Sequence, residues 1–206
     1  VAVTGLGVIA PCGIGVDAFW EGLCGSAPIG DRRIVDFDPA PYFSNPKEVR
    51  RADRCTQFAI AASEMALAQA GDLTADPARS GVFIGTGIGG IETLERQILV
   101  MNDKGERRVS PFLIPMMMPN AAPASVSMRY GFQGPAENTC TACAAGTHAL
   151  ANAARLIAHG RCDVVLAGGS EAPFVETAIA GFTNMTAFSS VGISRPFDAE
   201  RDGFVM

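Results

Sequence analysis

The sequence has 206 residues, which is enough for one sizeable domain or for part of a larger one. Hydrophobic residues make up 48%, charged residues 18%, and there are 23 glycines, a composition typical of buried parallel sheets covered by helices. The formal net charge of −5 argues against a nucleic-acid partner held by bulk charge, and the sequence contains no apolar run of membrane-spanning length.

Strand-like and helix-like segments alternate along the chain. In chain order we predict a buried strand at 1–4, a helix at 16–24, irregular structure at 25–47, a helix at 54–70, a strand at 80–85, helices at 91–101 and 121–130, a strand at 136–141, a helix from about 144 to 159, a strand at 164–167 and a helix at 177–184. The alternation predicts an α/β fold over residues 1–206. The chain ends on an apolar run after Gly203, which we interpret as a strand cut before its end, with a further piece of the protein missing.

Two glycine-rich segments match the dinucleotide-binding fingerprint. Residues 5–10 fit G-x-G-x-x-A, but Pro11 and Gly13 break the helix that a pyrophosphate needs. Residues 85–90 fit G-x-G-x-x-G and precede a helix, yet no acidic residue follows on a second predicted strand about 20 residues later. We interpret the second loop as one that approaches a neighbouring strand or an acyl chain as readily as a phosphate.

Six cysteines are scattered through apolar or helical contexts, which indicates a reducing cytosol rather than a disulfide framework. Cys140 and Cys143 form a C-x-x-C pair. No second Cys or His pair stands at zinc-ligand spacing, so no metal site is predicted. A redox pair is the weaker interpretation, because Cys140 falls in the strand-like run and not at a helix start.

Cys143 stands where a predicted strand turns into a helix of small residues. At a helix N-terminus, free N–H groups and the helix dipole stabilise a thiolate. Ala144 to Gly146 leave room beside the sulfur, and the Cys143 amide is free to donate to a developing oxyanion. The layout parallels the nucleophile turn of serine hydrolases, with Cys in place of Ser. A buried structural cysteine fits the same spacing equally well.

An acyl-carrying thiolate needs acid–base partners, and the chain has two histidines. His148 lies about 140° around the helix from Cys143, and His159 lies at the far end of the same helix. We therefore predict that both histidines are structural and that the base comes from elsewhere.

The segment from Glu137 to Gly146 resembles the T-A-C-x-x-G nucleophile segment of β-ketoacyl-[acyl carrier protein] synthases, most closely the type II elongating branch (KAS II). Further segments agree with this family in order, at 3–7, 85–90, 110–112, 167–171 and 194–204. The resemblance covers essentially the whole chain.

The resemblance implies a thiolase-like fold, a layered αβαβα core made by two pseudo-symmetric halves in a homodimer. Residues 1–206 correspond to the N-terminal half, and the family's two catalytic histidines belong to the absent C-terminal half. The implied reaction is the decarboxylative condensation of malonyl-carrier protein with an acyl group held on Cys143, in fatty-acid or polyketide synthesis. The expected partners are acyl carrier protein, a second copy and the C-terminal half, with no membrane, no cofactor beyond the carrier's phosphopantetheine, and a cytoplasmic location.

The resemblance also assigns roles to four apolar residues. By position, Ile88 looks like the residue that narrows the acyl tunnel and Phe182 like another wall residue. Leu113 and Ile114 look like the pair that lines the tunnel of the partner subunit. On the residues alone, ordinary core packing is favoured for Ile88, Leu113 and Phe182.

A basic cluster leads into the first long helix of an otherwise acidic protein. The resemblance implies docking of an acidic carrier protein here, whereas a solvated helix start is the simpler interpretation. Thr186 stands where many relatives carry a basic carrier-contacting residue. The cluster consists of Lys47, Arg50, Arg51 and Arg54.

Three alternatives remain open at this level. A CoA-dependent thiolase shares the fold and the nucleophilic cysteine. A non-catalytic partner such as a chain-length factor lacks the nucleophile, so Cys143 counts against it. The chain is also compatible with a structural half that is inactive until paired, and we expect no condensation from residues 1–206 alone.

Overall fold

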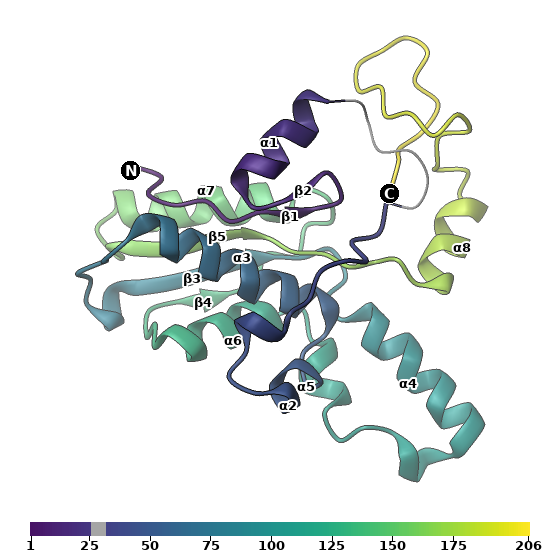
Figure 1. Ribbon diagram of the computed structural model, residues 1–206, viewed down its shortest axis with the longest axis horizontal. Coiled ribbons are helices and arrows are strands. Elements are labelled where there is room, and N and C mark those ends of the chain that lie inside the picture. The colour runs from purple at the N-terminus through teal and green to yellow at the C-terminus, as the bar shows by residue number, and fades with distance from the viewer. Residues whose placement is uncertain (26–31) are drawn as a thin grey trace.

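The computed structural model describes residues 1–25 and 32–206 (Figure 1). The helices are α1 (Val16–Cys24), α2 (Pro46–Val49), α3 (Arg54–Ala70), α4 (Ile91–Lys104), α5 (Leu113–Met117), α6 (Ala121–Tyr130), α7 (Ala145–Ala158) and α8 (Glu176–Asn184), with short 3-10 turns η1 (Ala40–Tyr42), η2 (Pro77–Arg79) and η3 (Glu106–Arg108). The strands are β1 (Ile9–Ala10), β2 (Gly13–Ile14), β3 (Ser80–Gly85), β4 (Ala136–Glu137) and β5 (Val164–Gly169).

The central sheet has three parallel strands in the order β4-β3-β5. β3 and β5 pair along their whole length, from Ser80 opposite Val164 to Gly85 opposite Gly169. Every residue of β3 is buried, as expected for a parallel strand covered on both faces. Because the strands are parallel, their carboxyl ends meet at one edge of the sheet.

Helices form a layer on each side of this sheet (Figure 1). On one face, α3 and α6 enclose the main hydrophobic core, which includes Ile60, Val82, Ile84 and Val126. On the other face, α7 packs against β3 and β5 through small residues such as Ala149, which is fully buried. Figure 1 shows α4 reaching away from the sheet and α8 lying beside the C-terminal segment.

A buried carboxylate fixes where α3 begins. Asp53 is 2% exposed and caps the helix by accepting a hydrogen bond from the Cys55 amide at 3.1 Å. Its second oxygen accepts from the Thr93 amide at 2.9 Å and the Thr93 hydroxyl at 2.6 Å. One side chain therefore joins the first turns of α3 and α4.

Most of the predicted elements are confirmed. The helices at 16–24, 54–70 and 121–130 and the strand at 80–85 have the predicted bounds. The elements predicted at 91–101, 164–167 and 177–184 are longer by one to three residues, and the helix predicted from about 144 to 159 is shorter by one residue at each end. Within the described residues, no helix is long and apolar enough to cross a membrane.

The predicted strand at 1–4 is wrong in this structure. Val1 and Val3 are 77% and 78% exposed, and the segment has no ladder partner among the residues that the structure describes. The residues that follow it contact α3: a Cβ on Gly7 would stand 1.8 Å from the Ala62 carbonyl oxygen, and the Leu6 amide donates to Gln69. An apolar run alone does not specify a ladder partner.

The predicted strand at 136–141 is shorter than expected. It pairs with β3 only at Ala136 and Glu137. Beyond that point the Asn138 side chain donates to the Ile84 carbonyl at 2.8 Å, so a side chain replaces the backbone ladder. The chain then turns toward α7.

Candidate active site at Cys143

The turn between β4 and α7 carries Cys143. Ala142 has a φ of 51°, in the left-handed region, which costs a non-glycine residue about 1–2 kcal/mol. The Ala144 amide donates to the Thr141 carbonyl at 3.2 Å, and the Ala145 amide to the Ala142 carbonyl at 3.0 Å. The tight turn therefore precedes the helix as predicted, and it holds a strained residue immediately before the cysteine.

Cys143 is exposed and stands two residues before the first residue of α7. Its amide makes no hydrogen bond to any of the residues that the structure describes. An exposed sulfur beside a free amide at a helix start has the geometry of a nucleophile with one oxyanion donor.

The other chemically relevant cysteines and histidines differ from Cys143. Cys55 is buried, and burial together with the nearby Asp53 carboxylate raises the pKa of its thiol, which disfavours the nucleophilic thiolate. His148 lies within 2.9 Å of the Thr141 hydroxyl, and no described hydrogen bond joins it to Cys143. Across residues 1–25 and 32–206, no three potential metal-ligating side chains gather.

Glycines let the start of α7 rest on the carboxyl ends of the strands. A Cβ on Gly85 would stand 2.4 Å from the Ala145 carbonyl oxygen, and one on Gly169 would stand 2.9 Å from the Gly146 Cα. No side chain fits either position. This contact places the Cys143 turn at the carboxyl edge of the parallel sheet, where ligands of open α/β sheets bind.

The glycine-rich loop after β3 lies beside this turn and is held by Glu171, two residues beyond β5. The Glu171 carboxylate accepts hydrogen bonds from the Thr86 hydroxyl at 2.9 Å, the Gly87 amide at 2.5 Å and the Ile88 amide at 3.2 Å. The Cys140 sulfur lies 3.5 Å from the Gly87 carbonyl oxygen. Sequence reasoning noted Glu171 only within a family motif and missed this role.

The structure brings the predicted wall residues Ile88, Leu113 and Ile114 into neighbouring elements. Ile88 is 41% exposed on the glycine loop, and the same loop contacts α5 because the Gly90 amide donates to the Met117 carbonyl at 3.2 Å. Leu113 is half-buried and Ile114 is exposed at the start of α5. The side chains of Ile88 and Ile114 are thus both exposed among the described residues of this chain.

Phe182 lies in a separate aromatic cluster of the C-terminal segment. Its ring centroid is 5.9 Å from that of Phe188 and 5.2 Å from that of Phe204. No described contact joins Phe182 to Cys143. The structure therefore does not bring this predicted wall residue to the other three.

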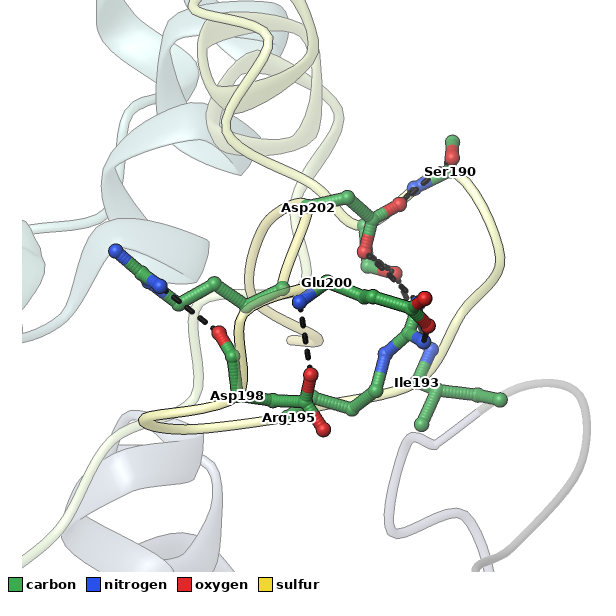
Figure 2. A network of polar contacts seen from close by, with 8 residues as sticks. Ser190, Ile193, Arg195, Asp198, Glu200 and Asp202 are labelled. Atoms are coloured by element: carbon green, nitrogen blue, oxygen red, sulfur yellow. Dashed lines mark hydrogen bonds and ion pairs between the residues drawn. The ribbon is translucent and has the colours of Figure 1, made fainter.

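A polar network shapes the loop between Phe188 and Phe204 (Figure 2). Asp202 accepts hydrogen bonds from the Ser190 amide and hydroxyl and from the Ser189 hydroxyl, and these bonds lower the pKa of Asp202 to about 2. Arg195 lies near both Asp202 and Glu200, as Figure 2 shows. The network holds this loop through polar contacts on the surface.

The predicted basic cluster separates into two parts. Arg54 is half-buried; it donates to the Ile34 and Phe37 carbonyls at 3.1 Å each, and desolvation lowers its pKa. It therefore serves to hold the segment before α3 rather than as a free surface charge. Lys47, Arg50 and Arg51 remain exposed, and the Arg51 guanidinium stacks 4.2 Å from the centroid of the Phe112 ring.

Comparison with known proteins agrees with this geometry. Residues 27–206 match the family described as "Beta-ketoacyl synthase, N-terminal domain". The whole chain is 41% identical over 230 residues to 3-oxoacyl-[acyl-carrier-protein] synthase 2 of Synechocystis sp. and 40% identical over 229 residues to the Staphylococcus aureus protein of that name. It covers 55% of each, so the chain spans about half the length of the curated relatives it matches.

Solved structures match the fold. A β-ketoacyl synthase from Burkholderia phymatum superposes with a TM-score of 0.75 at 29% identity, over 98% of this chain and 55% of that one. A ketosynthase in complex with its type II polyketide acyl-carrier protein gives 0.76 at 29% identity, over 90% and 54% of the two chains. The ishigamide ketosynthase/chain length factor gives 0.86 at 24% identity, over 98% and 54%, which supports the fold alone. The chain thus has the N-terminal half of the thiolase-like ketosynthase fold.

Proposed function

The chain belongs to the β-ketoacyl synthase family, and from that premise we propose that the protein containing it is a 3-oxoacyl-[acyl carrier protein] synthase of fatty-acid or polyketide synthesis. The observation that carries the proposal is the exposed Cys143 on a strained turn at a helix start. The domain comprises residues 1–206, and the acid–base histidines belong to a C-terminal half.

The proposed reaction runs through a thioester on Cys143. Its thiolate attacks the carbonyl carbon of an acyl-carrier protein, and the carrier's phosphopantetheine thiol leaves. Malonyl-carrier protein then loses CO₂, and the resulting carbanion attacks the Cys143 thioester carbon. The C–S bond breaks, 3-oxoacyl-carrier protein forms and the thiolate returns. The Cys143 amide donates to the oxyanion in both additions, and no cofactor beyond the carrier's phosphopantetheine enters these steps.

Acyl transfer and condensation by the full-length protein test this proposal. Cys143→Ala should abolish both the covalent acyl adduct and the formation of the 3-oxoacyl product, with a loss of about 10³-fold or more. The matched control is Cys140→Ala, three residues away and also exposed, which should keep the adduct on Cys143. An acyl adduct on Cys140, detected by mass spectrometry, would overturn the assignment.

The same assay separates the proposed synthase from a CoA-dependent thiolase. The synthase should take its acyl group from acyl-carrier protein and lose CO₂ from malonyl-carrier protein. Efficient acyl exchange with acetyl-CoA, without decarboxylation, is the result expected of a thiolase. No condensation or exchange by the full-length protein would favour a structural partner subunit.

Acyl carrier protein is the proposed macromolecular partner, and Lys47, Arg50 and Arg51 form its docking surface. Their positive charge complements an acidic carrier. The Arg51 guanidinium lies with its face over the Phe112 ring, and this arrangement leaves the N–H groups at the edge of the guanidinium available to a carboxylate. One matching ketosynthase structure is a complex with its carrier protein, which supports such docking.

Charge reversal tests this docking surface. Arg50→Glu together with Arg51→Glu should weaken carrier binding by about tenfold or more at low salt, and by less as salt screens the charges. Arg161→Glu, which reverses an exposed arginine in the turn after α7, is the matched control. Equal affinity of the docking double variant and the control, measured by titration, would exclude this surface.

The acyl pocket, the second copy and the cellular location complete the proposal. Ile88, Leu113 and Ile114 are the proposed wall residues near Cys143, with Leu113 and Ile114 facing the tunnel of a second copy in a homodimer. Phe182 remains a proposed wall residue whose link to Cys143 depends on parts of the protein outside this chain. The proposed location is the cytoplasm, where thiols remain reduced.

A further inference from the structure

The Glu171 carboxylate connects the end of one strand to the loop that follows its neighbour. Glu171 stands two residues beyond β5, and its three donors, Thr86, Gly87 and Ile88, follow β3 directly. Thr86 is 4% exposed, and its hydroxyl also accepts from the Gly89 amide at 3.1 Å. This one side chain therefore holds the first three residues of the loop.

A carboxylate suits this position because, when ionised, it accepts hydrogen bonds and donates none. Hydrogen bonds from backbone amides to an ionised carboxylate are among the stronger ones in proteins. Among the described residues no cation is paired with Glu171, so the amides and the hydroxyl are its partners. Removing the carboxylate leaves two adjacent amides without an acceptor and frees the loop to move.

The loop contacts the nucleophile turn directly. A Cβ on Gly87 would stand 3.5 Å from the Ala142 Cα and 3.6 Å from the Ala142 carbonyl carbon, the atom bonded to the Cys143 nitrogen. Even a methyl group at Gly87 would thus touch the residue that precedes Cys143, and the Gly87 carbonyl oxygen already lies 3.5 Å from the Cys140 sulfur. One Glu171 oxygen accepts hydrogen bonds from the Gly87 amide and from the amide of the next residue, Ile88.

We propose that Glu171 is a positioning residue for acyl-chain selectivity: by holding the Gly87 and Ile88 amides, it fixes the Ile88 side chain beside Cys143 and so limits the length of chain that the thioester site accepts. The inference rests on the proposed synthase function. Glu171 touches neither the sulfur nor the acyl group, and it acts through the backbone of the loop.

The test compares substrates of different length on the full-length protein. For each variant, kcat/KM is measured with a short and a long acyl-carrier protein, for example six and twelve carbons. Glu171→Leu keeps the size of the side chain but removes the acceptor, so the long-to-short ratio should rise by about fivefold. Glu171→Gln keeps one oxygen for the two amides and should raise the ratio by a smaller factor of about twofold. A variant that is merely less stable lowers both rates together and leaves the ratio unchanged.

Asp163→Ala is the matched control. Asp163 precedes β5 and joins it to η2, just before β3, through Arg79, so this variant also removes a carboxylate that bridges the two strands. It acts at the opposite edge of the sheet, and its ratio should equal that of the wild type. An equal rise in Asp163→Ala and Glu171→Leu would overturn the inference, because it would show a general effect of loosening the sheet.

A double-mutant cycle tests whether Glu171 acts through Ile88. Ile88→Ala alone should raise the ratio, and adding Glu171→Leu to it should change the ratio by less than about twofold. Full additivity would overturn the inference.

If Glu171→Leu does not fold, Glu171→Gln supplies the test, and an unchanged ratio together with unchanged amide hydrogen exchange at Gly87 and Ile88 overturns the inference. Wild-type protein without condensing activity is a different result, which refutes the proposed function itself.

Discussion

A carboxylate joins β3 to β5 at each end of the strand pair, but the two carboxylates bind different kinds of partner. At the amino end, Asp163 meets Arg79 in an exposed ion pair at 2.6 Å. At the carboxyl end, Glu171 meets two backbone amides and a buried hydroxyl, and the surrounding glycines admit the start of α7. The first contact joins two side chains, whereas the second fixes a backbone.

This difference shows at which end of a parallel sheet a side-chain contact can be replaced at little cost. An exposed ion pair contributes little, because water and salt screen it and both side chains are flexible. A carboxylate that holds amides beside a strained turn controls the positions of neighbouring residues, including Ile88. The site is therefore built where backbone, rather than side chain, makes the contacts. Three predictions test this contrast.

The largest effect should come from the close backbone contact at the carboxyl end. In Gly85→Ala the new Cβ would stand 2.4 Å and 2.5 Å from backbone atoms of Ala145, which can move only if α7 moves. We expect the free energy of unfolding to fall by about 3 kcal/mol or more, measured by chemical denaturation of the full-length protein.

Gly168→Ala is the control for that substitution. Gly168 lies on the paired strand opposite Ile84, and a Cβ there meets nothing within 4 Å. Its effect should stay within about 0.5 kcal/mol. Equal losses in Gly85→Ala and Gly168→Ala would show that strand propensity matters here and that the contact with α7 does not.

A smaller effect should come from the hydroxyl that Glu171 accepts. Thr86→Val keeps the shape of the side chain but removes the buried donor to Glu171 and the acceptor for the Gly89 amide, at a cost of about 2 kcal/mol. Thr86→Ser keeps the hydroxyl and should cost only about 1 kcal/mol for the lost methyl group. If thermal unfolding shows Thr86→Ser to be the more damaging, packing of the methyl group outweighs the hydrogen bond.

The smallest effect should come from the amino end. Hydrogen bonding to Arg79 lowers the pKa of Asp163, so its contribution is present above the unfolded pKa of about 3.9 and is lost as the pH falls through the lower folded value. Asp163→Asn should therefore reduce stability slightly at pH 7 and not at all in strong acid. The difference from wild type should also shrink at high salt. The measurement is denaturation of both proteins at several pH values and salt concentrations. A stability difference that does not change with salt would contradict the ion-pair interpretation.

The sequence allowed much of the fold to be predicted, because helix periods, glycine stops and apolar runs are local signals. The helix at Arg54–Ala70 and the strand at Ser80–Gly85 have the expected bounds. The strand predicted at 1–4 did not form among the described residues, because an apolar run does not by itself specify a ladder partner.

The site was predicted only in part. Local spacing placed Cys143 on a turn before a helix but left a buried cysteine equally open, and it did not show that the glycine loop lies beside this turn. The role of Glu171 could not be predicted, because its donors are 83 to 85 residues away in sequence. For the same reason the sequence placed Arg54 with the exposed cations, although the carbonyls of Ile34 and Phe37 enclose it.

The long reach of Glu171 also orders events during protein synthesis. The loop from Thr86 to Ile88 leaves the ribosome 85 residues before the carboxylate that holds Thr86. At about 5–20 residues per second, that interval lasts roughly 4–17 s. During this time β3 has left the ribosome without β5, and a strand that is fully buried in the folded chain is exposed to other chains or chaperones. The glycine loop can therefore reach its final geometry only after Glu171 has been added and β5 has paired with β3.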